Sequence, residues 1–477
     1  MPKSLPLLLA IVVVAGLCWA LAVPPWQSPD ELDHFAYAET LAENFSIPGT
    51  AGRQEDSSDE SFADHSVGAS RGAFYPGASP PEWSRSAYDA YLAVEQGRDP
   101  PARGDGGGLS GADQNPPLYY LFADIGYLLD HGGTAFGRLY AMRLWGVLLL
   151  AVTTSAAWLL AGETLGRRRL PQLVCAAVVG LLPMMTFISS SVNPDALLIT
   201  LWTLALWLGA RVINRRAGKW DVIALCAVTA AAILTKATSY ALVAPVVLAV
   251  AAGWLRRRPA ERRPALIPVA VGAAVLALPV LAWLALAHSL GRAGINNIGP
   301  TAAHPVNIRQ FLSYVWQFYL PRLPFLTPFR TTPGLPLYDV WLRQGIGTFG
   351  WLDVYLPSWL YPTVSVAIGV IAIASVGLLS RLLKRRHLPL LGFFALTALA
   401  LLMLLHVSEY LLVIDGGGGF NQGRYLLPVA GLLGLGVATI VSRLPRRART
   451  ATSGLVLTGM IALQVVSLAT IVQAYYL

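Results

Sequence analysis

The sequence predicts an all-α polytopic membrane protein with about eleven transmembrane helices. Its mean hydropathy is +0.55, and 13% of its 477 residues are charged, compared with roughly 25% in a typical soluble domain. Apolar runs that can cross a hydrocarbon core of about 30 Å as helices recur along the chain. The predicted spans are residues 5–23, 136–161, 170–190, 194–213, 220–235, 238–255, 265–288, 359–382, 389–412, 425–441 and 454–474.

The basic residues predict how these spans are oriented. The basic clusters between the spans all fall on one face only if the number of spans is odd and residues 220–255 cross the membrane twice. Because Lys and Arg favour the cytoplasmic side, we expect a cytoplasmic N-terminus and an extracytoplasmic C-terminus. The net charge of +9 is then a topology signal and needs no nucleic acid. The expected cytoplasmic clusters lie at residues 167–169, 211–219, 256–263, 381–386 and 443–449.

The first apolar run is expected to stay in the protein as a span. It is longer than the apolar core of a typical signal peptide, and residues 19–24 make a poor cleavage site. Leu17 before Cys18 argues against lipoprotein processing. The other cysteines, Cys175 and Cys226, also lie in apolar runs, so we expect no disulfide framework and no metal-thiolate site.

Two long loops are expected on the extracytoplasmic face. The first, residues 24–135, begins and ends with apolar patterns near residues 30–44 and 115–129 that predict helices lying on the membrane surface. Between them, residues 49–111 are rich in Gly, Pro, Ser and acidic residues, which predicts an irregular or mobile excursion. The second long loop is residues 289–358. The chain therefore divides into residues 1–288 with about seven spans, the loop 289–358, and residues 359–477 with about four spans.

Unusual polar residues are predicted to converge on the extracytoplasmic face. Ionisable groups at membrane depth are unfavourable and generally face a cavity or a partner. Carboxylates beside cations in an outward cavity suit an anionic lipid donor and a hydroxyl acceptor. The residues are Asp30, Glu31, Asp33, His34, Asn193, Asp195, Lys236, Asp353, Gln422 and Arg424.

Several of these residues also have a purely structural interpretation. Ser28 and Glu31 fit a capping box, with Ser28 as the N-cap and Glu31 at the third helical position. The box does not explain Asp30 and His34, which are four residues apart and share one helical face. Residues 193–195 likewise fit a helix start with proline at the first position.

The cations have structural and functional interpretations too. In the structural interpretation, the side chain of Lys236 snorkels to the interface, but Lys236 is the only lysine between Lys219 and Lys384. Arg424 follows the glycines at 416–419, which let a backbone approach a ligand closely. The glycine run is not a P-loop, because the strand and the Lys-Ser/Thr pair are missing.

A divalent metal is an alternative role for three residues of the first loop. Asp30, Asp33 and His34 carry carboxylate and imidazole ligands that suit Mg, Mn or Zn. Their spacing is too generic to select a metal, so Mg or Mn is a candidate cofactor and no metal site is assigned.

Several motifs resemble those of known membrane enzymes. Residues 115–120, Asn-Pro-Pro-Leu-Tyr-Tyr, are similar to the H-P-P-L-Y-Y of the lipid A aminoarabinose and protein mannosyltransferase branch of GT-C glycosyltransferases, with Asn115 in place of His. Residues 234–236 resemble the L-x-K segment of the same enzymes. P-D-E-x-x-H-F, S-V-N-P-D, G-x-F-G-W-L-D-x-x-L-P and Q-G-R-Y-L-L-P resemble a bacterial family of predicted membrane proteins of unknown function.

The GT-C resemblance implies a module of the first seven spans with two interfacial helices, and it implies polyprenyl-phosphate sugar as donor. It further implies that a first-loop Asp is the catalytic base and that cations of the outer face hold the donor phosphate. Asp30 is the expected base, oriented by Asp33 or His34, with Lys236 and Arg424 on the phosphate. The other expected site residues are Glu31, beside the base, and the substrate-binding residues Gln422, Asn193, Asp195, Asp353, Asn115 and Tyr119.

The expected activity is transfer of a hexose or pentose to an envelope glycan, lipid or protein on the outer face of the bacterial plasma membrane, with inversion. Two alternatives stay open: a lipid or polysaccharide transporter or flippase without catalysis, and a glycan polymerase or ligase that uses a diphosphate-linked donor. A transporter predicts polar residues that continue toward the inner leaflet. Few are found inside the spans beyond Arg143 and Glu409, which favours an enzyme.

Overall fold

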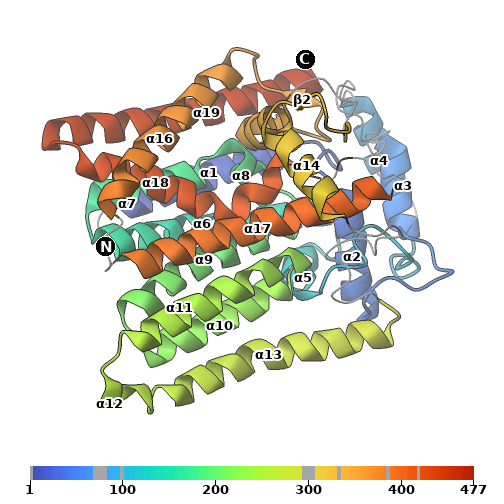
Figure 1. Ribbon diagram of the computed structural model, residues 1–477. Helices are drawn as coiled ribbons and strands as arrows, with labels where there is room; N and C mark the ends of the chain where they lie inside the picture. Colours follow the sequence, from blue (N-terminus) through green and yellow to red (C-terminus); the bar gives the residue numbers. More distant parts are fainter. Residues whose placement is uncertain are drawn as a thin grey trace.

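The computed structural model describes residues 4–67, 83–96, 101–292, 307–329, 335–382, 387–415, 419 and 421–477. Helices form nearly all of its regular structure, and the long ones lie side by side as a bundle (Figure 1). In a bilayer the helix is favoured because each backbone amide finds its partner within its own segment. The helices of the bundle are α1 (Ser4–Ala22), α6 (Ala135–Leu165), α7 (Arg169–Gly180), α8 (Pro183–Ser189), α9 (Asp195–Asn214), α10 (Lys219–Ile233), η1 (Ala237–Leu242), α11 (Val243–Leu255), α12 (Pro259–Arg262), α13 (Leu266–Ser289), α16 (Leu360–Leu382), α17 (Leu388–Ile414), η4 (Gly423–Val429), α18 (Ala430–Arg443) and α19 (Arg446–Tyr476).

Nine helical segments in the described part of the chain are long and apolar enough to cross a membrane, and a bent pair raises the number to ten. The pair is α7 and α8, which meet at an angle of 60° where Pro183 opens α8. The expected span at residues 220–235 is α10, whose 15 residues fall short of the roughly 20 that a bilayer requires. All the expected runs lie on helices, so the helical membrane architecture is confirmed, but the count of eleven is not.

The first long loop contains both of the helices that its apolar ends predict. α2 covers all but the first residue of the expected range 30–44, and α5 covers residues 118–129 of the expected range 115–129. On α5, the exposed side chains Leu121, Ile125 and Leu128 form an apolar stripe that suits a helix on a membrane surface. The helices of this loop are α2 (Glu31–Asn44), α3 (Ser58–Val67), α4 (Arg85–Gln96) and α5 (Leu118–Leu129).

The expectation that residues 49–111 are irregular is wrong for α3 and α4. A fully buried ion pair between Asp59 and Arg138 attaches α3 to α6. Composition could not reveal it, because the partner that compensates the buried carboxylate lies in a different part of the chain. Residues 68–82 and 97–100 of this excursion lie outside the described residues.

The described part of the second long loop contains a small hairpin. Its strands pair antiparallel, with Thr348 opposite Tyr355 and Phe349 opposite Val354, and Gly350 at φ +61° helps to form the turn. The hairpin departs from a purely helical fold. Residues 293–306 and 330–334 lie outside the described residues. The elements of this loop are α14 (Ile308–Tyr319), the π-helical segment η3 (Leu337–Gln344), α15 (Gly345–Gly347), β1 (Thr348–Phe349) and β2 (Val354–Tyr355).

The helix ends separate into two groups. In Figure 1, the N-terminus and α12 lie on the left, whereas α2 and α3 lie on the right. The left end, here called the basic end, gathers the basic clusters: Arg215 pairs with Glu163 at 3.7 Å, and Arg257 donates to the carbonyl of Ala217. The opposite end, with α2 to α5, is here called the loop end. Of the basic clusters, residues 383–386 lie outside the described part. This separation agrees with the charge pattern, and the side of the membrane that each end faces stays a prediction.

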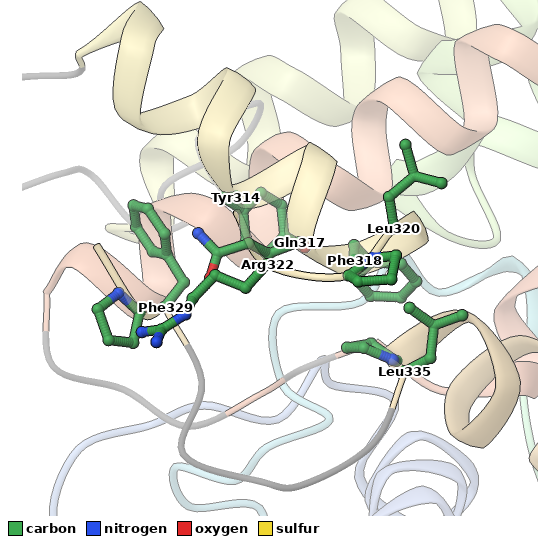
Figure 2. A pocket seen from close by; sticks show the side chains of 10 residues that line it. Tyr314, Gln317, Phe318, Leu320, Arg322, Phe329 and Leu335 are labelled. Carbon is green, nitrogen blue, oxygen red and sulfur yellow. The ribbon is translucent and has the colours of Figure 1, made fainter. Parts of the chain in front are cut away.

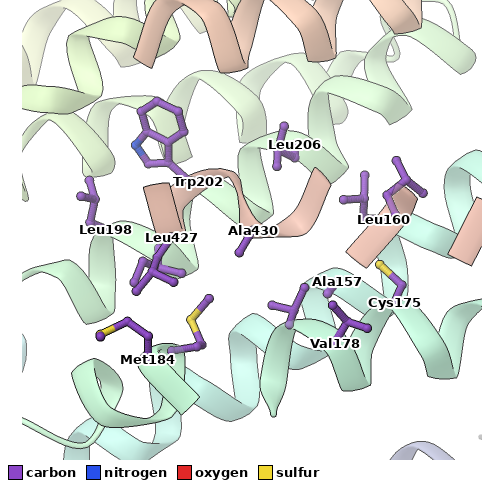
Figure 3. Close-up of a cluster of buried hydrophobic side chains, with 14 of the residues drawn as sticks. Ala157, Leu160, Cys175, Val178, Met184, Leu198, Trp202, Leu206, Leu427 and Ala430 are labelled. Carbon is purple, nitrogen blue, oxygen red and sulfur yellow. The ribbon is translucent and has the colours of Figure 1, made fainter. Parts of the chain in front are cut away.

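One apolar core joins helices from both predicted modules (Figure 3). Trp202 of α9, Cys175 of α7 and Leu427 of η4 belong to the same cluster of buried side chains. Gly434 lets α18 approach α7, since a Cβ atom there would lie 2.7 Å from the carbonyl oxygen of Cys175. The C-terminal module thus packs into the first one, and the division of the chain into modules stays a prediction.

Cysteine labelling tests the orientation. In a variant whose three native cysteines are replaced by alanine, Leu109→Cys should react with a membrane-impermeant maleimide in intact cells, because Leu109 is exposed at the loop end. Arg258→Cys, exposed at the basic end, should react only after permeabilisation. Labelling of the residue 258 position in intact cells would reverse the orientation and move the candidate site to the cytoplasm.

Candidate functional site

At the loop end, two ion pairs bring together four residues that the sequence singled out. Arg424 donates through Nη2 to Oδ2 of Asp30 at 2.8 Å, although the two residues are 394 positions apart. Lys236 donates through Nζ to Oδ1 of Asp195 at 2.6 Å. The pairs join the start of α2, the start of α9, the break between α10 and η1, and the start of η4.

Arg424 is the most enclosed cation of the group, with 5% of its side chain exposed. Its Nε and Nη1 atoms are buried and make no hydrogen bond within the described structure. Arg424 lines a cavity of about 70 Å³ together with Lys236, Asp195 and Tyr425. A buried guanidinium with unused donors is unfavourable unless a further acceptor binds there. The cavity is therefore a candidate anion site.

The segment before Arg424 is held tightly in place. The amide of Gly423 donates to Oε1 of Gln344 at 3.0 Å, and a Cβ atom on Gly423 would clash with the backbone nitrogen of Gly345. Glycine is therefore required directly before the arginine. Gln422 lies beside Arg424 at a second, smaller cavity, and its buried Oε1 has no partner in the described part of the chain. The preceding glycines at 416–418 lie outside the described residues.

Lys236 sits at the break between two helices, where its backbone is extended at φ −157°. Its ammonium group lies 5.3 Å from the centre of the Tyr425 ring, and the guanidinium carbon of Arg424 lies at the same distance from that ring. An aromatic face attracts cations, so Tyr425 helps to hold both charges at one cavity. About a quarter of the Lys236 side chain is exposed, at 24%.

Asp30 precedes α2 in a left-handed backbone conformation, with φ +59°. Asp tolerates this region better than most residues, and such conformations are common at functional sites. Burial raises the pKa of Asp30, but the positive charges of Arg424 and Lys236 and the hydrogen bond from Arg424 outweigh it and hold the pKa below its ordinary value of 3.8. The carboxylate is ionised at neutral pH, and 43% of its side chain is exposed.

His34 lies one helical turn after Asp30, is buried, and is neutral at physiological pH. Burial lowers its pKa from 6.5 to about 4. Its Nδ1 atom lies 3.0 Å from the Tyr120 hydroxyl, which also accepts from Nδ2 of Asn115 at 3.2 Å. The Tyr37 ring stacks on Tyr120 with 3.5 Å between centroids, and the Tyr37 hydroxyl donates to the carbonyl of Asn115. Asn115 thus supports the first turn of α2 through Tyr120.

Asn193 and Tyr119 support the two loops that carry the carboxylates. Asn193 donates through Nδ2 to the carbonyl of Pro29 at 3.1 Å, and its Oδ1 accepts from the amide of Asp195 at 2.9 Å. The Tyr119 hydroxyl bonds to the backbone of Asn193. Asn193 therefore stabilises the start of α9, as its structural interpretation predicts, and also ties Asp195 to the residue before Asp30.

The capping box predicted at Ser28 and Glu31 does not form. α2 begins at Glu31, and the N-cap is Asp30, whose side chain makes no capping bond. Glu31 is instead fully buried against Arg143, with contacts of 2.8 and 2.5 Å, and accepts from the amide of Val192 at 3.1 Å. The long-range ion pair with Arg143 therefore replaces the local capping interaction that the sequence predicts for Glu31.

Two of the predicted residues lie apart from the ion pairs. Asp353 accepts through Oδ1 from the amide of Trp351 at 3.0 Å and stabilises the turn of the hairpin. Asp33 projects toward the first loop, where a Cβ atom on Gly111 would lie 3.3 Å from its Oδ2. The roles that the sequence predicts for Asp33 and Asp353 at the site stay predictions.

The family model described as "Predicted membrane protein (DUF2142)" matches residues 13–433. The chain belongs to this family. The match confirms the narrower of the two resemblances seen in the motifs, and the membrane class that the hydropathy predicts. No curated protein matches the chain.

Three solved structures are similar to this DUF2142 protein at low identity. ArnT from Cupriavidus metallidurans bound to undecaprenyl phosphate is 14% identical, with 98% of this chain and 75% of that chain covered and a TM-score of 0.46. The archaeal oligosaccharyltransferase AglB from Archaeoglobus fulgidus, in complex with an inhibitory peptide and a dolichol-phosphate, is 12% identical, with 98% of this chain and 56% of that chain covered and a TM-score of 0.48. The arabinosyltransferase EmbB from Mycobacterium smegmatis is 12% identical, with 98% of this chain and 41% of that chain covered and a TM-score of 0.40. Since all three TM-scores lie below 0.5, we draw no conclusion about fold or activity from these likenesses.

The residues of the DUF2142 site do not fit a divalent metal. Within the described residues, no three His, Cys, Asp or Glu side chains come together as they do in a metal site made of protein ligands alone. The Asp30 carboxylate is paired with Arg424, Asp195 is paired with Lys236, and His34 bonds to Tyr120. A metal cation at Asp30 would have to compete with the guanidinium of Arg424.

Sequence reasoning missed the residues that support the site. Tyr425, which both cations face, and Gln344, which holds Gly423, carry no charge and resemble ordinary membrane-helix residues. Arg143 was visible as a charge inside a span, but its partner Glu31 was not. A charged residue deep in an apolar run signals a buried partner, so the search for that partner could have found the pair.

The pair of Glu31 and Arg143 predicts a large stability effect. Glu31→Gln should lower the free energy of unfolding by about 3–5 kcal/mol, because a buried guanidinium loses its charged partner. Thermal unfolding of the purified protein in detergent would measure the loss. Glu261→Gln, the same change at an exposed position of α12, is the matched control and should change stability little. Wild-type stability in Glu31→Gln would contradict a structural role for the pair.

Proposed function

We propose that the protein is an integral-membrane glycosyltransferase that moves a sugar from a polyprenyl-phosphate donor to a hydroxyl of an envelope acceptor. The reaction takes place on the outer face of the bacterial plasma membrane, at the loop end. One observation carries the proposal: the buried guanidinium of Arg424 leaves Nε and Nη1 unused at a cavity that it shares with Lys236. A phosphate group supplies the oxygens that such donors lack.

The cavity suits the head of a lipid phosphate on both its polar and its apolar sides. Arg424 offers a planar fork for two phosphate oxygens, and Lys236 offers a compact charge beside it. Neither has to give up its carboxylate, because Arg424 uses one nitrogen for Asp30 and Lys236 has three donor hydrogens. Leu401 and Leu405 of α17 line the other side, where the first isoprene units of the donor would lie.

Asp30 is the proposed base. It is bound to Nη2 of Arg424, while Nε and Nη1 remain for the phosphate, so the base and the leaving group share one guanidinium. Its exposed part can reach an acceptor hydroxyl. In the transfer step, the acceptor oxygen forms a bond to the anomeric carbon as the bond from that carbon to the phosphate oxygen breaks. The hydroxyl proton passes to Asp30, and the phosphate leaves with the electron pair. This single displacement inverts the anomeric centre.

Donor binding would strengthen this base. In the free protein the pKa of Asp30 lies below 3.8, chiefly because nearby cations oppose the effect of burial. A carboxylate with such a pKa accepts protons weakly at neutral pH. The negative charge of a phosphate on Arg424 and Lys236 raises the pKa of a neighbouring carboxyl group. Asp30 would therefore become an effective base only when the donor is in place, which limits wasteful chemistry.

The supporting residues have positioning roles in this proposal. Glu31 and Arg143 fix the start of α2, and Asn193 joins that start to α9. His34 is polar but neutral, so it adds no positive charge beside Asp30. The proposal assigns Asp33 and Asp353 to the acceptor side, where they would contact the incoming glycan.

A direct assay tests the proposal. Purified protein in detergent is mixed with radiolabelled polyprenyl-phosphate hexoses and pentoses, and with envelope extracts as acceptors. Transfer of label to an acceptor, dependent on Asp30, is the expected result. Transfer only from polyprenyl-diphosphate glycans would identify a polymerase or ligase instead. No transfer from either donor would overturn the glycosyltransferase assignment.

A further inference from the structure

A second cavity, of about 220 Å³, lies beneath α14 at the loop end (Figure 2). Its walls come from α14, from the chain that follows it, and from residues 335–336. The volume is that of about seven water molecules, and it is below the roughly 300 Å³ at which pockets for drug-sized ligands begin. The cavity therefore has room for one small ring such as a monosaccharide unit.

Aromatic rings form much of the wall. Tyr314 packs against Phe318 with 6.3 Å between ring centroids, and against Phe329 with 6.0 Å. The faces of aromatic rings carry partial negative charge and attract positively polarised C–H groups. A sugar ring presents C–H groups on its faces and hydroxyls at its edge, so it matches walls of this kind.

Two polar side chains at the cavity have unused hydrogen-bonding capacity. Arg322 is exposed and has no ion pair or hydrogen bond with any other described residue. Gln317 donates through Nε2 to Ser313 and to the carbonyl of Thr327, at 3.1 and 2.8 Å, which fixes its amide while its Oε1 accepts no bond from the described residues. A guanidinium suits a carboxylate or phosphate, and an amide oxygen suits a hydroxyl.

A buried hydrogen-bond network connects this cavity to the phosphate site. The Tyr314 hydroxyl donates to Oε2 of Glu409 at 2.6 Å, and Nδ2 of Asn421 donates to the same oxygen. Asn421 lies three residues before Arg424 in the segment that carries the guanidinium. Tyr314 and Glu409 are both almost fully buried, so this connection is rigid. The cavity is thus held in a fixed position relative to Arg424.

The opposite face of α14 places the cavity at a membrane surface. Ile308, Leu312 and Trp316 are exposed and recur every four residues, which makes an apolar stripe along the helix. Such a stripe suits a helix that lies in the interface, and tryptophan is favoured at that depth. A ligand of the cavity would therefore be a group carried close to the bilayer.

From these observations we propose that the cavity beneath α14 is an acceptor subsite that binds one anionic sugar unit of an envelope glycan. That the bound unit is an acceptor rests on the proposed function, whereas binding of the sugar in the cavity does not require the donor. Arg322 pairs with the carboxylate or phosphate of the unit, and Gln317 accepts from a hydroxyl. The ring of the unit packs against Phe329 and against the small exposed parts of Tyr314 and Phe318. The subsite makes the enzyme selective for acidic acceptors.

Direct binding without donor tests the subsite. The probes are a uronate-containing oligosaccharide, an oligosaccharide of the same length that carries glycerol phosphate, and a neutral one. Binding to the purified full chain is measured by calorimetry. The carboxylate and phosphate probes should bind at least about tenfold more tightly than the neutral one, as one charge-assisted hydrogen bond allows. A preference for only one of the two anionic probes would identify the source of the charge.

Arg322→Gln should abolish the preference for anionic probes and leave neutral binding unchanged. Arg309→Gln, an exposed arginine of the same region that does not line the cavity, is the matched control and should keep the preference. Equal binding of all three probes to the wild type, or a preference that survives Arg322→Gln, overturns the subsite. Arg322-dependent binding without any sugar transfer would instead retain the glycan site and overturn the proposed catalysis, so the two failures are distinguishable.

Discussion

Asp30→Asn is expected to lower the rate of sugar transfer by at least about 100-fold, the usual contribution of a general base. Asparagine has nearly the same shape as aspartate and also tolerates the left-handed backbone at this position. Its amide oxygen can still accept from Arg424, so the start of α2 should keep its structure. The substitution removes only the capacity to take a proton. Initial rates at saturating donor and acceptor measure the loss, and gel filtration checks that the protein stays folded.

Two further substitutions give this result its meaning. Asp89→Asn, on α4 at the surface, should leave the rate unchanged, because Asp89 is exposed and pairs with Arg85 of the same helix. Asp33→Asn should lower the rate less than Asp30→Asn, since Asp33 projects toward Gly111. If Asp30→Asn keeps a near-normal rate and Asp33→Asn does not, the base is Asp33 and the role of Arg424 must be revised.

The positions of the helices could be predicted because hydropathy is a local property. Each apolar run reports whether its own residues can bury in lipid, and no partner is needed. The bend at Pro183 and the short α10 could not be predicted in this way. Both depend on packing against neighbouring helices, which decides whether a break in a run is a loop or a kink.

The site was partly predictable for a related reason. Asp30, Asp195, Lys236 and Arg424 stand out because charge at membrane depth is unfavourable without a partner. The same rule selected Asp353, whose carboxylate is used locally by the turn of the hairpin. Sequence could not tell these cases apart, since the pairing of Asp30 with Arg424 spans 394 positions.

The capping box fails for the opposite reason. Residues 28–31 match the local pattern well, but the pattern assumes that no stronger partner competes for Glu31. Arg143, which is 112 positions away, is fully buried, and Glu31 is its carboxylate partner in the described part of the chain. A buried guanidinium requires that carboxylate far more than a helix end does, because water can satisfy the amides of a helix start.

Arg424→Ala is expected to weaken binding of the donor about ten- to a hundredfold. The change removes a charge-assisted hydrogen bond from a buried site, worth roughly 1.5–3 kcal/mol. Arg424→Lys keeps the charge but loses the planar fork, so it should retain part of the affinity. Binding of polyprenyl phosphate without a sugar to the purified protein measures the effect directly. Arg85→Ala, an exposed arginine of α4, is the control and should bind as the wild type does.

The same variants separate an enzyme from a transporter, because the two differ in what Arg424 does after the lipid is bound. In an enzyme, the guanidinium stabilises the phosphate as it gains charge in the transition state, so Arg424→Lys should lower turnover more than it lowers affinity. That effect appears in detergent, where a new glycosidic bond can form without two leaflets. A transporter makes no bond, and its Arg424-dependent step appears only in vesicles. Lipid translocation that requires Arg424, together with no product from any lipid-linked sugar in detergent, would therefore exclude the glycosyltransferase and leave Arg424 as a lipid-phosphate ligand of a flippase.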